Sequence, residues 1–153
     1  MKEERNREFG IEKAIQKYGC AVIVPGGNSM LPLLKPNQCS VWIKKKETYH
    51  KYEIVLYRRR DGRFILHRIV GIEKEGFVLC GDNQTEKEKG IRKEQILGAA
   101  EQWEENGKTI TSGAFGYRLY VFFWCRLFFL RRLVFLPGKL VRRVRYQLKQ
   151  KME

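Results

Sequence analysis

Short runs of β-branched and aromatic residues, separated by turn-forming residues, constrain the fold of this chain more than any other feature. The runs begin at Cys20, Cys39, Tyr52 and Phe64. Such side chains favour strands because they pack well on a pleated surface. The turn-forming sequences between and after the runs are Pro25-Gly26-Gly27, Lys35-Pro36-Asn37, Asp61-Gly62, Glu75-Gly76 and Asn106-Gly107. We therefore expect a compact, mainly antiparallel, barrel-like β-fold, with tight hairpins at Asp61-Gly62 and Asn106-Gly107.

The first residues predict a short amphipathic helix over residues 3–18. Its apolar positions, spaced close to the helical period, are Phe9, Ile11, Ala14, Ile15 and Tyr18. We expect this helix to pack on the domain. The chain starts with Met1-Lys2-Glu3-Glu4-Arg5, which lacks the apolar core of a secretory signal, so the cytoplasmic side is the favoured location.

Charge divides the chain into two parts. With 153 residues, 43% of them hydrophobic, the chain can form one domain with a modest core. Its formal net charge is +14, but residues 113–153 contain ten Lys or Arg against the single acid Glu153. This basic segment therefore carries +9 of the total. We predict a domain over residues 1–112 and a hydrophobic, basic helical tail over residues 113–153.

The tail pattern indicates a helix lying on a surface rather than one crossing a membrane. A spanning helix needs roughly 20 mostly apolar residues, whereas Arg126, Arg131 and Arg132 interrupt the aromatic-rich stretch. Aromatic and apolar residues interleaved with arginines suit the interface of an anionic bilayer. We expect residues 115–151 to bind such a membrane surface, and docking on a partner protein or dimerisation is the alternative. Nucleic-acid binding is not expected, because the basic residues do not form a polar face.

The cysteines give no sign of a metal site. Cys20, Cys39, Cys80 and Cys125 occur singly, without a paired motif or a nearby histidine cluster. We interpret them as small buried apolar residues, with a disulfide between two of the first three as the other reading. No metal or cofactor is expected.

Ser29 and His67 are the candidate reactive residues. Ser29 lies in Gly27-Asn28-Ser29-Met30-Leu31-Pro32, and His67 follows 38 positions later in a β-patterned run. A serine hydroxyl is a poor nucleophile unless a base takes its proton, and histidine suits that task near neutral pH. Strand alternation places His67 on one face with Ile65 and Ile69. The turn before Ser29 can leave backbone N–H groups free for an oxyanion hole.

Five blocks in order resemble the signal peptidase I family and its LexA-type superfamily. They are Ser29-Met30-Leu31-Pro32, Tyr52-Glu53-Ile54-Val55-Leu56-Tyr57, His67-Arg68-Ile69-Val70, Gly81-Asp82-Asn83 and Ile96-Leu97-Gly98. The resemblance covers residues 20–112, and His67 makes it similar to the members whose base is histidine, as in archaea and the endoplasmic reticulum. It implies the family's β-fold, with Ser29 as the acylating nucleophile and His67 as the general base.

The resemblance leaves the third catalytic residue open. Asp82 aligns with the aspartate of the family's Gly-Asp-Asn block, and Glu88 stands where histidine-type members carry an orienting carboxylate. Many relatives have a serine at the position of Gly27, so an oxyanion hole here is expected to use the Ser29 N–H and Asn28. We expect Met30 and Pro32 to contact the substrate.

These features together predict a membrane-associated serine endopeptidase of the signal peptidase type. It would cleave a leader or signal peptide from a precursor protein through an acyl-enzyme. The alternative is a catalytically impaired peptidase-fold protein that binds peptides or partners at a membrane surface. A self-cleaving repressor-type peptidase is disfavoured, because the 28 residues before Ser29 are too few for a DNA-binding domain.

Overall fold

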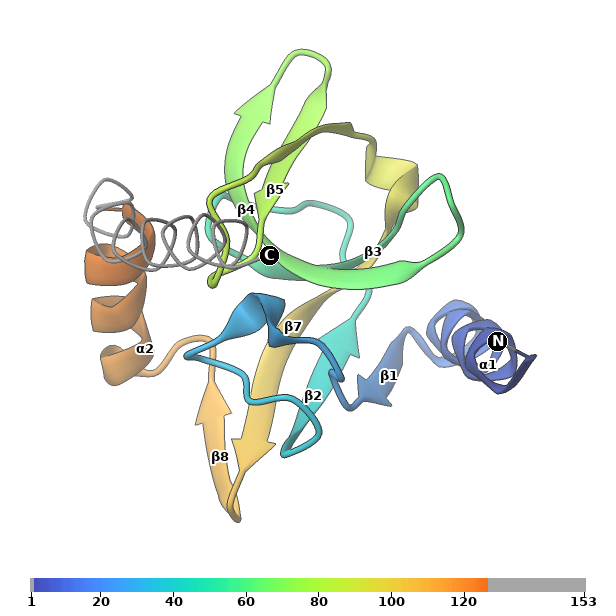
Figure 1. Ribbon diagram of the computed structural model, residues 1–153, viewed down its shortest axis with the longest axis horizontal. Coiled ribbons are helices and arrows are strands. Elements are labelled where there is room, and N and C mark those ends of the chain that lie inside the picture. Colours follow the sequence, from blue (N-terminus) through green and yellow to red (C-terminus); the bar gives the residue numbers. More distant parts are fainter. Residues whose placement is uncertain (1, 127–153) are drawn as a thin grey trace, which may run out of the picture.

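The computed structural model describes residues 2–126 of the chain as a β-sheet system with a helix at each end (Figure 1). The strands are β1 (Cys20–Ile23), β2 (Cys39–Lys44), β3 (Ile54–Arg58), β4 (Phe64–Glu73), β5 (Gly76–Cys80), β6 (Glu88–Ile91), β7 (Ile96–Glu105) and β8 (Lys108–Thr111). The helical elements are α1 (Lys2–Tyr18), the short turns η1 (Asn28–Met30) and η2 (Lys93–Gln95), α2 (Phe115–Tyr120) and the π-helical η3 (Val121–Arg126).

All strand pairs are antiparallel, in the order β1-β2-β7-β3-β4-β5-β6, with β8 added beside β7. The prediction of a mainly antiparallel β-fold is confirmed. The described sheet is not closed, so the expected barrel-like arrangement stops short of a barrel. Its end strands β1 and β6 each have four residues and pair with one neighbour only.

The two predicted hairpins occur where their turn residues stand. Asn106 and Gly107 have φ angles of 52° and 73°, and they join Glu105 directly to its partner Lys108. Positive φ at both central residues is what a two-residue turn needs to follow the strand twist. The loop from β3 to β4 also turns at a left-handed glycine, Gly62, with φ of 89°.

The sheet separates two hydrophobic clusters, and β3 contributes to both. Ile54 and Leu56 lie in the first cluster together with Leu66, whereas Val55 and Tyr57 lie in the second. This alternation follows from the two-residue period of a strand. On β4, Leu66 belongs to the first cluster, whereas Ile65 and Ile69 pack in the second. His67 shares a face with Ile65 and Ile69, as predicted from the alternation, and so faces the second cluster.

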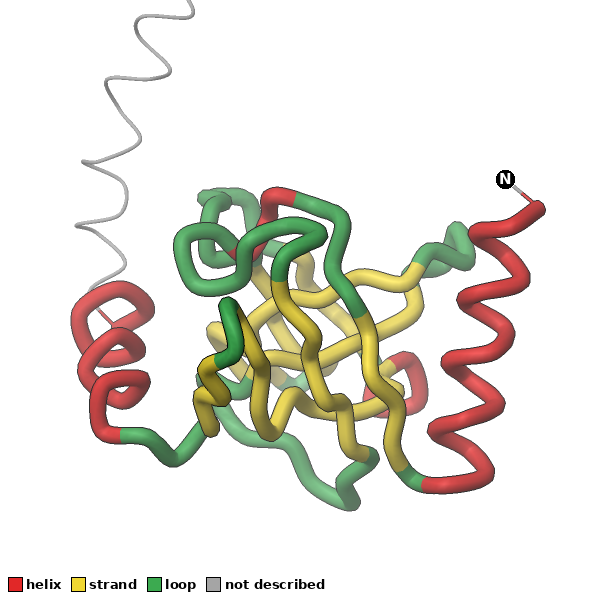
Figure 2. Tube along the Cα trace, turned by 90° about the horizontal axis from the view of Figure 1, so that it is seen from below, coloured by secondary structure: helices red, strands yellow, loops and turns green. Residues whose placement is uncertain are grey.

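The helices lie at opposite ends of the sheet (Figures 1 and 2). Helix α1 begins and ends close to its predicted bounds, and Ile15 buries its side chain in the first cluster. At the other end, α2 and η3 form the first part of the predicted tail. The rest of that tail, residues 127–153, lies outside the described residues.

All four cysteines are free thiols. Cys39, Cys80 and Cys125 are buried, as expected for small apolar side chains, whereas Cys20 is exposed. The disulfide reading is therefore not supported.

Candidate functional site

Ser29 lies at the centre of the short turn η1, between β1 and β2. The turn packs against β4, the strand that carries His67. Among residues 2–126, neither the hydroxyl nor the N–H of Ser29 has a hydrogen-bond partner. Pro32 is exposed, whereas Met30 is 1% exposed and packs in the first cluster. The Met30 side chain therefore presents no open surface to a substrate.

The loop after β5 holds the Ser29 turn in place. The N–H of Asn83 donates to the Ser29 carbonyl over 2.8 Å, and Asn83 Nδ2 donates to the Asn28 carbonyl over 3.1 Å. Gly81 lies so close that a Cβ on it would stand 2.6 Å from the Ser29 carbonyl oxygen. Glycine allows this approach because it has no side chain. Gly81 and Asn83 therefore fix the position of Ser29.

Asp82, between these two residues, forms a buried ion pair with Arg68. Nε of Arg68 lies 2.8 Å from Oδ1, Nη2 lies 2.5 Å from Oδ2, and both residues are 0% exposed. Nη1 of Arg68 donates to the carbonyl of Tyr52 and to the hydroxyl of Tyr117. Burial lowers the pKa of Arg68, but the charge and hydrogen bonds of Asp82 raise it further, so Arg68 stays a cation. The pair ties the loop that holds Ser29 to the residue next to His67.

Glu88, rather than Asp82, is the carboxylate bonded to the His67 imidazole. Oε1 of Glu88 lies 3.2 Å from Nδ1 of His67, and the Tyr57 hydroxyl lies 3.4 Å from the same nitrogen. Tyr57 donates its hydroxyl proton to Glu88 over 2.6 Å, and Arg59 holds the same carboxylate through Nε and Nη2. Tyr57 and Arg59 therefore fix the position of the Glu88 carboxylate.

This environment assigns a tautomer to His67. The Tyr57 hydroxyl donates its proton to Glu88, so toward Nδ1 of His67 it can only accept a hydrogen bond. Nδ1 therefore faces two acceptors, the oxygens of Tyr57 and Glu88, and is the nitrogen that carries hydrogen. In the described part of the chain, Nε2 has no hydrogen-bond partner. A neutral imidazole with a bare Nε2 can accept a proton from a hydroxyl.

Burial keeps His67 neutral. The side chain is 2% exposed, and this burial lowers its pKa from 6.5 to about 4. Glu88 raises the pKa in part, while the positive charge of Arg59 opposes that effect. The pKa of Glu88 itself is lowered, because the hydrogen bonds from Arg59 and Tyr57 outweigh its own desolvation. At neutral pH the pair is therefore a neutral imidazole beside a carboxylate.

Sequence reasoning missed Tyr57 and Arg59. The β3–β4 register places Val55 opposite His67 and Tyr57 opposite Ile65, so Tyr57 is the diagonal neighbour of His67. Diagonal neighbours lie within reach of long aromatic side chains, and counting outward from the Asp61-Gly62 turn would have suggested this pair. Arg59 lies beyond the end of β3, and no periodic pattern marks it.

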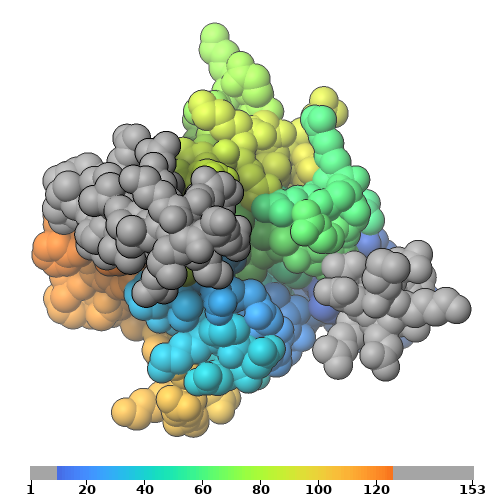
Figure 3. All heavy atoms as spheres, viewed as in Figure 1, coloured from blue at the N-terminus to red at the C-terminus, as the bar shows by residue number. Residues whose placement is uncertain are grey.

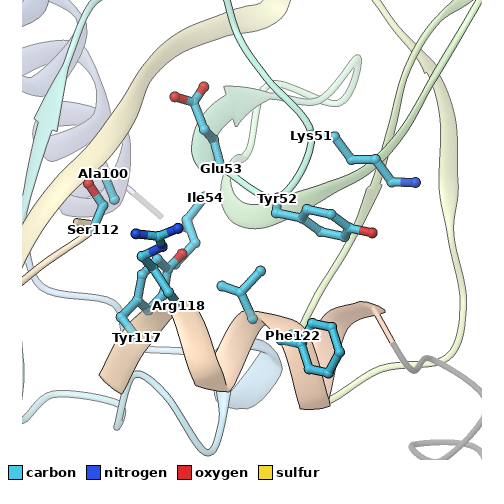
Figure 4. Close-up of a pocket in the computed structure, with 10 residues that line it drawn as sticks. Lys51, Tyr52, Glu53, Ile54, Ala100, Ser112, Tyr117, Arg118 and Phe122 are labelled. Atoms are coloured by element: carbon cyan, nitrogen blue, oxygen red, sulfur yellow. The ribbon is translucent and has the colours of Figure 1, made fainter. Parts of the chain in front are cut away.

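A cavity of about 460 Å³ lies between the helix α2–η3 and the residues leading into β3. In Figure 4, Tyr117, Arg118 and Phe122 line it from the helix, and Tyr52 and Ile54 line it from the domain. Neither Ser29 nor His67 borders it. It lies beside the ion pair, because Tyr52 and Tyr117 both bind Arg68.

Comparison of the chain with models of known protein families, with curated proteins and with solved structures finds no match. The resemblance to signal peptidases therefore rests on the five sequence blocks.

Replacing Gly81 by alanine should destabilise the protein by displacing the Ser29 turn. We expect Gly81→Ala to lower the free energy of unfolding by about 1–3 kcal/mol, because the nearest atom to the added Cβ is the backbone oxygen of Ser29, which cannot move aside as the Gln84 side chain can. Gly27→Ala is the matched control, since a Cβ there meets nothing within 4 Å and its φ of −95° suits any residue. Urea unfolding of both variants measures the difference, and equal stabilities would contradict the close approach.

The pKa of His67 predicts a loss of stability in acid. The unfolded chain binds this proton near pH 6.5 and the folded chain only near pH 4, so the stability that neutral His67 contributes falls as pH drops through that window. Relative to His67→Gln, the wild type should lose free energy of unfolding between these values. Urea titrations at several pH values measure this, with the exposed His50→Gln as control. A constant difference between wild type and His67→Gln would contradict the assignment.

Proposed function

We propose that this protein is a serine endopeptidase of the signal peptidase type, with Ser29 as nucleophile and His67 as general base. In the proposed reaction, the Ser29 oxygen attacks the scissile carbonyl carbon while its proton passes to Nε2 of His67. The imidazolium then gives that proton to the leaving amine, and water hydrolyses the resulting ester. Glu88 orients the imidazole through Nδ1, and the Ser29 N–H, with Asn28 beside it, faces the developing oxyanion.

The observation that carries this proposal is the buried, neutral His67, with Nδ1 against Glu88 and Nε2 unoccupied among the described residues. A histidine that only fills space in a core does not need a carboxylate fixed by Tyr57 and Arg59. This arrangement has a cost, since it buries an ionisable network. Asp82 has a different role in this proposal, because the Arg68 ion pair occupies its carboxylate.

The sheet edges support an extended peptide as substrate. Strand β1, which leads into the Ser29 turn, pairs with β2 alone among the described strands. The pairing of β4 with β5 begins at Arg68, directly after His67. An extended substrate can therefore add main-chain hydrogen bonds along the open edge of β1, the strand that precedes the Ser29 turn. The family resemblance implies small substrate residues at the first and third positions before the cleaved bond.

Covalent labelling of Ser29 tests the proposal without a known substrate. Full-length protein is incubated with serine-directed acylating probes, a β-lactam and a fluorophosphonate, and adducts are mapped by peptide mass spectrometry. We expect an adduct on Ser29, none in Ser29→Ala, and labelling slowed about 10²-fold to 10⁴-fold in His67→Ala, because general-base catalysis contributes about that factor. The exposed Ser112→Ala is the matched control and should react as the wild type does.

Two results would contradict the proposal. Labelling of Ser29 at an equal rate in His67→Ala would remove His67 from the mechanism. A folded wild type that no probe labels, and that leaves candidate precursors uncut, would favour the alternative of an impaired peptidase-fold protein that binds peptides.

We further propose that the tail binds an anionic membrane surface. No helix within residues 2–126 is long and apolar enough to cross a membrane. The outward face of α2–η3, at the edge of the molecule in Figure 3, exposes Phe115, Leu119 and Phe123 by 44% to 74%. Together with the +9 charge of residues 113–153, this apolar face suits the interface of an anionic bilayer.

Vesicle co-sedimentation tests this attachment. We expect the protein to bind anionic phospholipid vesicles and not neutral ones. The double variant Phe115→Ser, Phe123→Ser should bind at least about tenfold more weakly, because it lacks two exposed aromatic rings that would enter the bilayer interface. Tyr18→Ser removes an equally exposed aromatic residue from α1 and serves as control. A dimer with no affinity for vesicles, or preferential binding to DNA, would contradict the membrane proposal.

A further inference from the structure

The indole of Trp124 and the carbonyl of Ser29 bind the two ends of one peptide group. Nε1 of Trp124 donates to the carbonyl of Asp82 over 3.0 Å. The N–H of Asn83, which belongs to the same peptide group, donates to the Ser29 carbonyl over 2.8 Å. A peptide group is planar, so its C=O and N–H rotate together. Any movement of Trp124 that turns this plane therefore disturbs the bond that holds Ser29.

The helix α2–η3, which carries Trp124, also forms a hydrogen bond with the side chain of Asp82. The Tyr120 hydroxyl donates to Oδ2 of Asp82 over 3.0 Å, and the Tyr117 hydroxyl accepts from Arg68 over 2.6 Å. The rings of Tyr117, Tyr120 and Trp124 stack in sequence, with centroids 6.4 Å apart at each step. One face of the helix is thus built around the ion pair and the loop that fixes Ser29.

The rest of the helix packs on the domain at Cys125, which is buried, and leaves other residues away from it. The cavity of about 460 Å³ separates its Val121 and Phe122 from the start of β3. Phe115, Leu119 and Phe123 on the outward side are exposed. The three stacked aromatic residues make hydrogen bonds that dock the helix, and these bonds reach Asp82 and Arg68.

We infer that Trp124 and Tyr120 are positioning residues for the Ser29 nucleophile, and that docking of the helix α2–η3 is coupled to the reactivity of Ser29. This inference rests on the proposed function, in which Ser29 is the nucleophile. An attacking oxygen has to be held close to its productive position, so a loosened Asp82–Asn83 peptide lowers the acylation rate. Such coupling is reciprocal in equilibrium terms, so a ligand bound at Ser29 also favours the docked helix.

Acylation kinetics of full-length variants test the coupling. Trp124→Phe keeps the stacked ring but removes the N–H donor, and Tyr120→Phe removes only the hydroxyl. With the probe that labels the wild type, we expect the maximal acylation rate to fall about threefold to tenfold in each variant, the factor that corresponds to one lost hydrogen bond. The probe concentration that gives half-maximal rate should stay unchanged. Tyr18→Phe makes the same chemical change on exposed α1 and should match the wild type.

Hydrogen exchange of the Asn83 amide provides a readout that does not need catalysis. We expect faster exchange at Asn83 in Trp124→Phe than in Tyr18→Phe, with the amides of β3 and β4 unchanged. Wild-type acylation rates together with wild-type exchange at Asn83 would overturn the inference, as would a uniform acceleration across the sheet, which indicates general destabilisation. A wild type without any Ser29 adduct defeats the proposed function, whereas a selective change at Asn83 would still support the coupling.

Discussion

The ion pair of Arg68 and Asp82 is the interaction on which the arrangement of the site depends. Both residues are fully buried, and their hydrogen bonds join four separate parts of the chain: strand β4, the loop after β5, Tyr52 ahead of β3 and the helix α2–η3. Two charges can remain in an apolar interior only when they are paired and their remaining donors and acceptors are satisfied. Removing one partner of such a pair costs about 3–5 kcal/mol, so the four parts are held in one arrangement.

That arrangement fixes Ser29 and His67 through separate sets of contacts. Arg68 anchors one end of the pair next to His67, and Asp82 anchors the other end between Gly81 and Asn83, which hold Ser29. His67 is held separately, because its Nδ1 contacts the carboxylate of Glu88. The carboxylate of Asp82 is held in the ion pair with Arg68 and has a structural role. The carboxylate of Glu88 lies beside the imidazole and orients it. His67 is a neutral imidazole with hydrogen on Nδ1, and its Nε2 has no hydrogen-bond partner within residues 2–126.

Local patterns in the sequence predict local structure here, and long-range polar contacts escape them. The Asn106-Gly107 turn follows from the few residues that tolerate positive φ, and the face of His67 follows from strand alternation. The sequence also led to both carboxylates, but it could not decide between Asp82 and Glu88, because the choice depends on which one Arg68 occupies. Arg59 carries no pattern at all, and Met30, expected at the substrate, is core. These outcomes depend on distances between strands that no spacing in the chain encodes.

Nitrogen-15 NMR of the imidazoles most directly tests whether His67 is neutral with hydrogen on Nδ1. The chain has two histidines, so His67→Gln assigns both sets of ring signals. The account predicts that at pH 7 His67 is the neutral tautomer with hydrogen on Nδ1, and that it stays neutral to pH 5, above its pKa of about 4. A tautomer with hydrogen on Nε2, or an imidazolium at pH 5, would contradict the account.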